Sequence, residues 1–203
     1  MAYGIRAATI TFATLAFVLA AATQANACAC CTNAGQRNVG MSKIDAYAAG
    51  VLDTVRFGAN AQLYTGEADI GDIKGIKAAS DRWTMVVAKT SKTWRLAFDD
   101  GKGNTGNVVF VLPASITKFE VDTRAPEPAR SNGEPLLYKE WRLTTKAEGA
   151  GMFAGTTGHA QQATLILHGR GNSCTDASQF TAWSLVLHGA KGTSTVFGTL
   201  QPQ

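Results

Sequence analysis

Several features that define large classes of protein are missing from this chain of 203 residues. No stretch after residue 27 approaches the roughly 20 apolar residues of a membrane-spanning helix, which excludes a polytopic membrane protein. Charged residues make up only 17% of the chain and no run of four Lys or Arg occurs, so the clustered basic surface of a nucleic-acid-binding protein is not expected. The regular recurrence of apolar residues also excludes an intrinsically disordered chain.

Motifs of the common hydrolases and nucleotide-binding enzymes are missing too. The sequence has no G-x-S-x-G, no H-E-x-x-H and no phosphate-binding Walker loop. A hydrolase that pairs His168 with a nucleophile in the following loop is the one catalytic hypothesis that we keep, and no oxyanion or nucleophile signature accompanies it. A protein that binds rather than catalyses is therefore the favoured class.

The first 27 residues have the three-part layout of a secretory signal peptide. Arg6 supplies a positive charge, residues 10–22 form an apolar segment, and Ala25-Asn26-Ala27 is a small-residue cleavage site. The 13 residues of the apolar segment would form a helix of about 20 Å, too short for the hydrocarbon core of a membrane. We expect export to an extracytoplasmic location, either the periplasm or the medium.

Two cleavage sites compete at the start of the mature chain. Cleavage after Ala27 leaves Cys28 as the first residue, whereas cleavage after Ala29 removes it. Lipidation of Cys28 is the weaker alternative, because lipoprotein signals carry a branched apolar residue three positions earlier, where this chain has Ala25. Residues 28–42 are expected to form an irregular Cys-rich arm, and residues 43–203 a single β-rich domain.

Alternation of apolar and polar residues predicts an all-β domain. Every second residue is apolar in residues 55–63, 94–98, 119–121 and 141–143, as in antiparallel strands with one buried face. Other stretches are apolar on both faces and are expected to be central strands; they are residues 83–88, 108–112 and 163–167. With residues 183–187 and 196–200 the count reaches about nine strands, and residues 44–52 can form one short helix. The pattern predicts an antiparallel β-sandwich or a small β-barrel.

Cysteine is the strongest chemical signal. Cys28, Cys30 and Cys31 lie at the expected mature start, and the fourth cysteine is Cys174. In an oxidising compartment all four are disulfide candidates, and every complete pairing joins Cys174 to one member of the N-terminal cluster. Such a bridge would stabilise the fold by of the order of 3–5 kcal/mol. Alternatively, thiolates at this spacing suit a soft metal ion, copper or zinc.

His168 is the histidine best placed to complete a metal site. If residues 168 and 180 face each other across a hairpin, His159 lies beside His188, while His168 lies near the loop that carries Cys174. His168 shares its face with Ile166 and therefore lies off the leucine-rich face. The candidate ligands of copper or zinc are Cys28, Cys30, Cys31, Cys174 and His168.

Two functional hypotheses follow from these residues. The leading one is an extracytoplasmic protein that binds a soft metal ion, or is thiol-active, through Cys28, Cys30 and Cys31. The alternative is a disulfide-stapled β module that binds a small apolar ligand or has a structural role. In that case the four tryptophans, Trp83, Trp94, Trp141 and Trp183, either line a cavity or pack the core.

Overall fold

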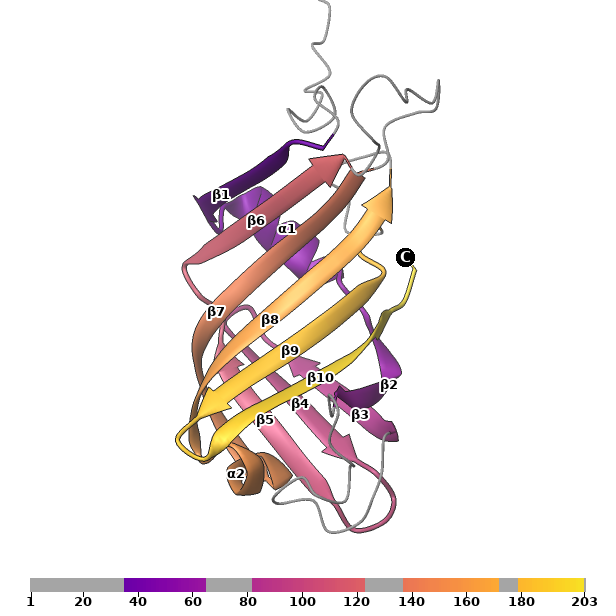
Figure 1. The fold of residues 1–203 in the computed structure, drawn as a ribbon, viewed down its shortest axis with the longest axis vertical. Helices are drawn as coiled ribbons and strands as arrows, with labels where there is room; N and C mark the ends of the chain where they lie inside the picture. Colours follow the sequence, from indigo (N-terminus) through magenta and orange to yellow (C-terminus); the bar gives the residue numbers. More distant parts are fainter. Residues whose placement is uncertain (1–34, 65–81, 123–136, 172–178, 203) are drawn as a thin grey trace, which may run out of the picture.

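A computed structural model describes residues 35–64, 82–122, 137–171 and 179–202. The signal-like segment and all four cysteines lie outside the described residues. The described chain contains ten strands and two short helices (Figure 1). In chain order they are β1 (Arg37–Lys43), α1 (Ala46–Thr54), β2 (Phe57–Tyr64), β3 (Arg82–Lys89), β4 (Thr93–Asp99), β5 (Thr105–Val111), β6 (Ser115–Asp122), β7 (Leu137–Gly151), α2 (Met152–Thr156), β8 (Ala160–Gly171), β9 (Ala182–Gly189) and β10 (Gly192–Leu200).

Eight of the strands close into an antiparallel barrel. The order around it is β2, β3, β4, β5, β7, β8, β9 and β10, and β10 pairs with β2 to complete the circle. Figure 1 shows β7 to β10 in front and β3 to β5 behind. The prediction of an all-β antiparallel fold is confirmed, and of its two architectures the chain adopts the barrel.

The other two strands, β6 and β1, extend the sheet beyond the barrel. The first half of β7 pairs with β6 and its last residues pair with β5, so β5 and β6 follow one another along the same edge of β7. Pro113 lies between them and has no N–H to donate to a neighbouring strand. On one side of it Leu112 N donates to Lys92 O (2.7 Å), and on the other Ala114 O accepts from Ile44 N (3.0 Å). The chain thus pairs with the β4 side of the barrel up to Leu112 and with the β1 side from Ala114 onward.

The barrel interior is filled by the apolar face of each strand. Trp94, Leu96 and Phe98, predicted to share a face, are between 0% and 3% exposed, and Trp141 and Leu143 are equally buried. All four tryptophans belong to this core. Of the two roles expected for the tryptophans, lining a cavity or packing the core, the described residues show packing.

Small residues make room for two of the indoles. Trp83, Ala61, Gly198 and Trp183 form one row across β3, β2, β10 and β9. The indole of Trp183 lies so close to Gly198 that a Cβ there would be 2.9 Å from Trp183 Nε1. Phe57 contacts Trp183 and Trp94 edge to face, with ring centroids 5.5 and 5.8 Å apart. The barrel therefore closes around a tightly packed aromatic centre.

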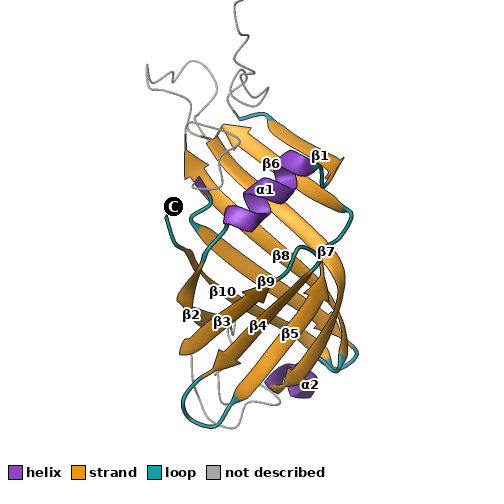
Figure 2. Ribbon diagram, turned by 180° about the vertical axis from the view of Figure 1, so that it is seen from behind, coloured by secondary structure: helices purple, strands orange, loops and turns teal. Residues whose placement is uncertain are grey.

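The two helices lie at opposite ends of the barrel (Figure 2). Helix α1 starts two residues later than predicted, because Asp45 caps it: the Asp45 carboxylate accepts from Ala48 N at 2.8 Å. At its other end, Lys89 Nζ donates to the carbonyl oxygens of Leu52 (2.7 Å) and Val55 (3.0 Å). Helix α2 (Met152–Thr156) was not expected from the sequence, which indicated at most one helix.

Three local expectations differ from the structure. Strand β1 begins inside the arm expected to be irregular. Phe119 and Val121, expected on a buried face, are half-buried, while Ile116 of the opposite face is fully buried. The strands that are apolar on both faces bury only one of them, since Val86 and Val111 are 71% and 57% exposed. A closed barrel has one interior, so the second apolar face of such a strand lies outside.

Candidate functional site

Of the predicted ligands, His168 is the one that the structure describes. Cys28, Cys30, Cys31 and Cys174 lie outside the described residues, so neither a disulfide nor a thiolate site is tested. His168 lies on the outer face of β8, opposite Glu140 of β7 and Ala182 of β9. The prediction that it lies off the leucine-rich face is confirmed by the burial of Leu165 and Leu167 on the other side.

His168 adjoins a network of polar side chains on β7. The Tyr138 hydroxyl donates to Glu140 Oε1 (2.6 Å), and Arg142 Nε donates to Glu140 Oε2 (2.7 Å). The ring of Tyr138 lies 6.4 Å from that of His168, measured between centroids. The Glu140 carboxylate therefore has partners on both oxygens and its side chain is only 13% exposed.

Burial sets the protonation of this network. Burial, and then the hydrogen bond to Glu140, raise the pKa of Tyr138 to about 12, so its hydroxyl stays a donor at neutral pH. Burial lowers the pKa of His168 below its ordinary value of 6.5, against a smaller opposing effect of the Glu140 charge. A neutral imidazole is the form that binds metal ions, so His168 is suited chemically to the role predicted for it.

The predicted pairing of the other two histidines is wrong. His188 lies opposite Gln162, and His168 opposite Ala182, because the β8–β9 hairpin is shifted by two residues from the register assumed. His159 instead lies directly before β8, with Nδ1 3.2 Å from Gly149 O. The ring of His188 contacts Thr193 Oγ1 of β10 (2.8 Å).

The register brings the two chain segments that lead to the cysteines to one end of the sheet. Arg37, Val121, Tyr138 and Arg170 form a row across β1, β6, β7 and β8. Three strand spacings separate Arg37 from Arg170, roughly 14 Å. Cys31 lies six residues before Arg37 and Cys174 four residues after Arg170, which correspond to chain lengths of up to about 20 and 13 Å.

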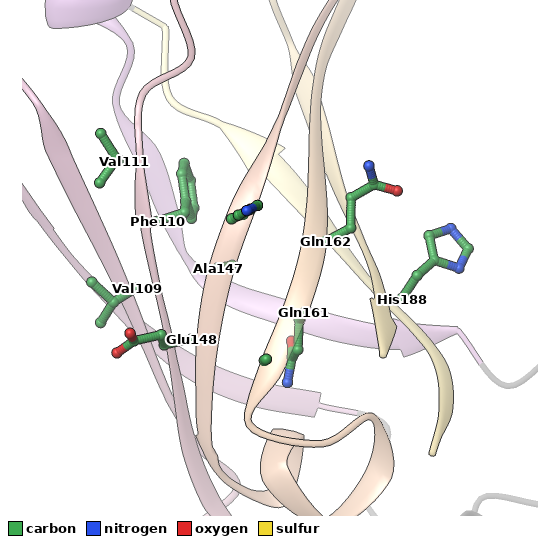
Figure 3. A pocket seen from close by; sticks show the side chains of 10 residues that line it. Val109, Phe110, Val111, Ala147, Glu148, Gln161, Gln162 and His188 are labelled. Atoms are coloured by element: carbon green, nitrogen blue, oxygen red, sulfur yellow. The ribbon is translucent and has the colours of Figure 1, made fainter. Parts of the chain in front are cut away.

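A groove of about 760 Å³ lies elsewhere, on the outer face where β5, β7, β8 and β9 meet. Val109 and Val111 of β5 form one flank and Gln162 and His188 the other, as Figure 3 shows. Lys146 and Glu148 project from β7 between the flanks. A second hollow of about 340 Å³ shares Val109 and Glu148 and continues to His159. Sequence patterns did not indicate this groove, because its residues come from four strands.

Sequence reasoning also missed a buried lysine. Lys139 is 2% exposed and lies on the inner face of β7, between Leu137 and Trp141. Its Nζ donates to Gln179 Oε1 (3.2 Å) and lies 4.6 Å from the centroid of the Phe180 ring. The alternation of inward and outward residues in β7 could have shown that this lysine is buried. Lys139 lies an even number of residues from Trp141 and Leu143 and therefore on the same face.

Within the described ranges, no three His, Cys, Asp or Glu side chains gather closely enough to hold a metal ion. The same ranges contain no helix with the length and apolar character needed to cross a membrane. Comparisons of the chain with protein-family models, with curated proteins and with solved structures found no match. Proposals about its function therefore depend on its own residues.

Proposed function

We propose that the mature protein is an extracytoplasmic binding protein that holds a small amphipathic molecule in the outer groove between β5 and β9. The observation that carries the proposal is the groove itself, whose volume of about 760 Å³ is within the range of small-molecule sites. Export is indicated by the signal-like residues 1–27. No step of catalysis is needed to account for the groove.

The lining of the groove determines the chemistry of its ligand. Val111 is 57% exposed and Val109 half-buried, so both present apolar surface that a ligand would remove from water. Gln162 and His188 on the opposite flank offer hydrogen-bonding groups to a polar end of the same molecule. An apolar body with one polar end therefore fits the two flanks.

Fluorescence of 1-anilinonaphthalene-8-sulfonate, which has an apolar body and one anionic group, tests the groove. We expect saturable binding to the mature protein and about tenfold weaker binding to Val111→Asp, since the variant loses about 1 kcal/mol of apolar contact and buries a carboxylate. Val86→Asp is the matched control, because Val86 is also exposed on the outside of the barrel but lies outside the groove.

Equal affinity of the two variants, or no saturable signal, would refute the groove as the binding site. Thermal unfolding of both variants has to remain at the wild-type temperature, as expected for outward-facing residues. A difference in binding can then be assigned to contact with the probe.

A second candidate function is soft-metal binding or thiol chemistry at the end of the sheet that carries Arg37 and Arg170. What supports it is the row in which these two residues lie, roughly 14 Å apart. The chain from Cys31 to Arg37 and the chain from Arg170 to Cys174 are together longer than this separation, so the two cysteines can meet. His168 lies on the outer face two residue pairs along from this row, where it pairs with Glu140. Cys28, Cys30, Cys31, Cys174 and His168 therefore remain the proposed ligands of copper or zinc.

Intact mass of the exported protein, native and denatured, after alkylation of free thiols, separates the outcomes. Bound metal lost on denaturation, and weakened by His168→Ala but not by the control His188→Ala, would support a metal site. Full copper and zinc binding after Cys30→Ser and Cys31→Ser would contradict it. Complete oxidation of the cysteines without metal would assign them to disulfides instead.

A further inference from the structure

Strand β1 ends the sheet, and the backbone groups on its outer edge can be assigned. The pairing of Lys43 with Ser115 continues to Ile44, whose N–H donates to Ala114 O. Alternate residues of a strand direct their N–H and C=O to opposite edges. Asn38, Gly40 and Ser42 therefore face β6, whereas the backbone groups of Arg37, Val39 and Met41 and the N–H of Lys43 point to the other edge. The carbonyl oxygen of Lys43 accepts from Asp45 N (3.1 Å). None of the described strands pairs with that edge.

The same four residues place their side chains on the outer face of the sheet. Met41 and Val39 are 76% and 68% exposed, so they present apolar surface at the edge itself. Val39 lies opposite Phe119 of β6, whose ring contacts Tyr138 edge to face at 6.2 Å. Apolar surface thus continues from the edge onto the face of the sheet.

Strand β1 has few of the features that prevent edge pairing. It contains no proline, and its seven residues pair with β6 in one uninterrupted register, without a bulge. Its two charges, Arg37 and Lys43, lie at the ends of the exposed row and have the same sign. Two copies of β1 paired antiparallel over their whole length would place Arg37 opposite Lys43 twice, which is destabilising.

We propose that the open edge of β1 binds an extended segment of another protein by strand addition, with acidic residues opposite Arg37 and Lys43 and apolar residues opposite Val39 and Met41. The backbone groups of β1 supply the hydrogen bonds, and Val39 and Met41 supply the apolar contacts. The cationic ends select the partner by charge complementarity and disfavour a second copy of this chain. This site is separate from the groove and does not depend on it.

Fluorescence anisotropy with two labelled peptides tests the selection by charge. The peptides are Glu-Thr-Val-Thr-Val-Thr-Glu and its counterpart with Lys at both ends, each added to the mature protein. We expect the acidic peptide to bind at least tenfold more tightly, and the double variant Arg37→Glu, Lys43→Glu to reverse this preference. The difference should shrink as salt is added, since both charges are at the surface.

A backbone variant tests strand addition itself. Met41→Pro removes an N–H that points away from β6, so the fold should persist while both peptides lose binding. Gly40→Pro is the contrasting control, because the N–H that it removes faces β6 and its loss should lower the unfolding temperature.

Three results would overturn the proposal. They are the absence of saturable binding of either peptide, equal binding that the charge reversal leaves unchanged, and unaltered binding to Met41→Pro. A fourth such result would come from the oligomeric state of the unliganded protein, measured by analytical ultracentrifugation. A dimer that Met41→Pro dissociates would make a second copy of the chain the occupant of the edge.

Discussion

Gly198 offers the sharpest test of the packing around the buried tryptophans. It lies in β10 between Ala61 of β2 and Trp183 of β9. A Cβ at this position would lie 2.8 Å from Asn60 O, 2.9 Å from Trp183 Nε1 and 3.0 Å from Trp183 Cζ2. The carbonyl belongs to a paired strand and the indole is fully buried, so neither can move away without disturbing its neighbours.

We expect Gly198→Ala to lower the free energy of unfolding by about 1–3 kcal/mol, the cost of adding one methyl group to a filled core. For a domain of this size the unfolding temperature should fall by about 2–12 °C. Gly50→Ala is the same chemical change in helix α1, where a Cβ would meet nothing within 4 Å. There the methyl group should stabilise the protein by about 0.5–1 kcal/mol, because alanine favours the helix over glycine.

Urea unfolding followed by circular dichroism measures both variants, and a double variant identifies the source of the clash. Trp183→Phe removes two of the three atoms nearest to the added Cβ, Nε1 and Cζ2, so Gly198→Ala should cost less in that background, with a coupling of about 0.5–3 kcal/mol. The contact with Asn60 O remains, so rescue should be partial. Equal stability of the two alanine variants, or strict additivity in the double variant, would show that the indole does not occupy this space.

Three further predictions concern titratable groups. Burial first, and then the charge of Arg56, lower the pKa of Lys89 from 10.5 to about 8. The unfolded chain therefore binds this proton more tightly, so stability should rise with pH between about 8 and 10.5, and urea unfolding of Lys89→Met should show a smaller rise. The pKa of Tyr138, raised to about 12, should move toward its ordinary value of 10 in Glu140→Gln, as followed by absorbance at 295 nm. His168 should titrate below its ordinary 6.5 in NMR spectra, because burial lowers its pKa. Acidification below about pH 6.5 should therefore cost stability, and His168→Gln should reduce that loss.

The elements that sequence patterns predicted are those whose signal is local. Trp94, Leu96 and Phe98 alternate with polar residues, and this period of two fixes both the strand and its buried face. Helix α1 was placed within two residues by its apolar spacing. Lys139 could have been placed inside the barrel in the same way, since it shares the parity of Trp141; its charge, however, argued for the surface.

The features that were missed depend on contacts between distant segments. The pairing of His188 with Gln162 depends on the length of the β8–β9 connection, which the residue types of the strands do not fix. Strand β1 escaped prediction because its pattern is inverted, with Val39 and Met41 outside and Gly40 and Ser42 on the inner side. Its place in the sheet depends on pairing with β6, some 75 residues away. The four cysteines lie outside the described residues, so their predicted roles stay predictions.

The strands that are apolar on both faces determine where apolar binding surfaces lie. Residues 83–88, 108–112 and 163–167 were expected to be central strands because both of their faces are apolar. Closure into one barrel buries the inner face alone, so Val86, Val109 and Val111 remain outside. Val39 and Met41 are likewise exposed, at the open edge of the sheet. Exposed apolar groups of this kind cost solubility without aiding the core. The position of Val109 and Val111 in the groove, and of Val39 and Met41 along β1, therefore favours contact with other molecules as the reason for these four.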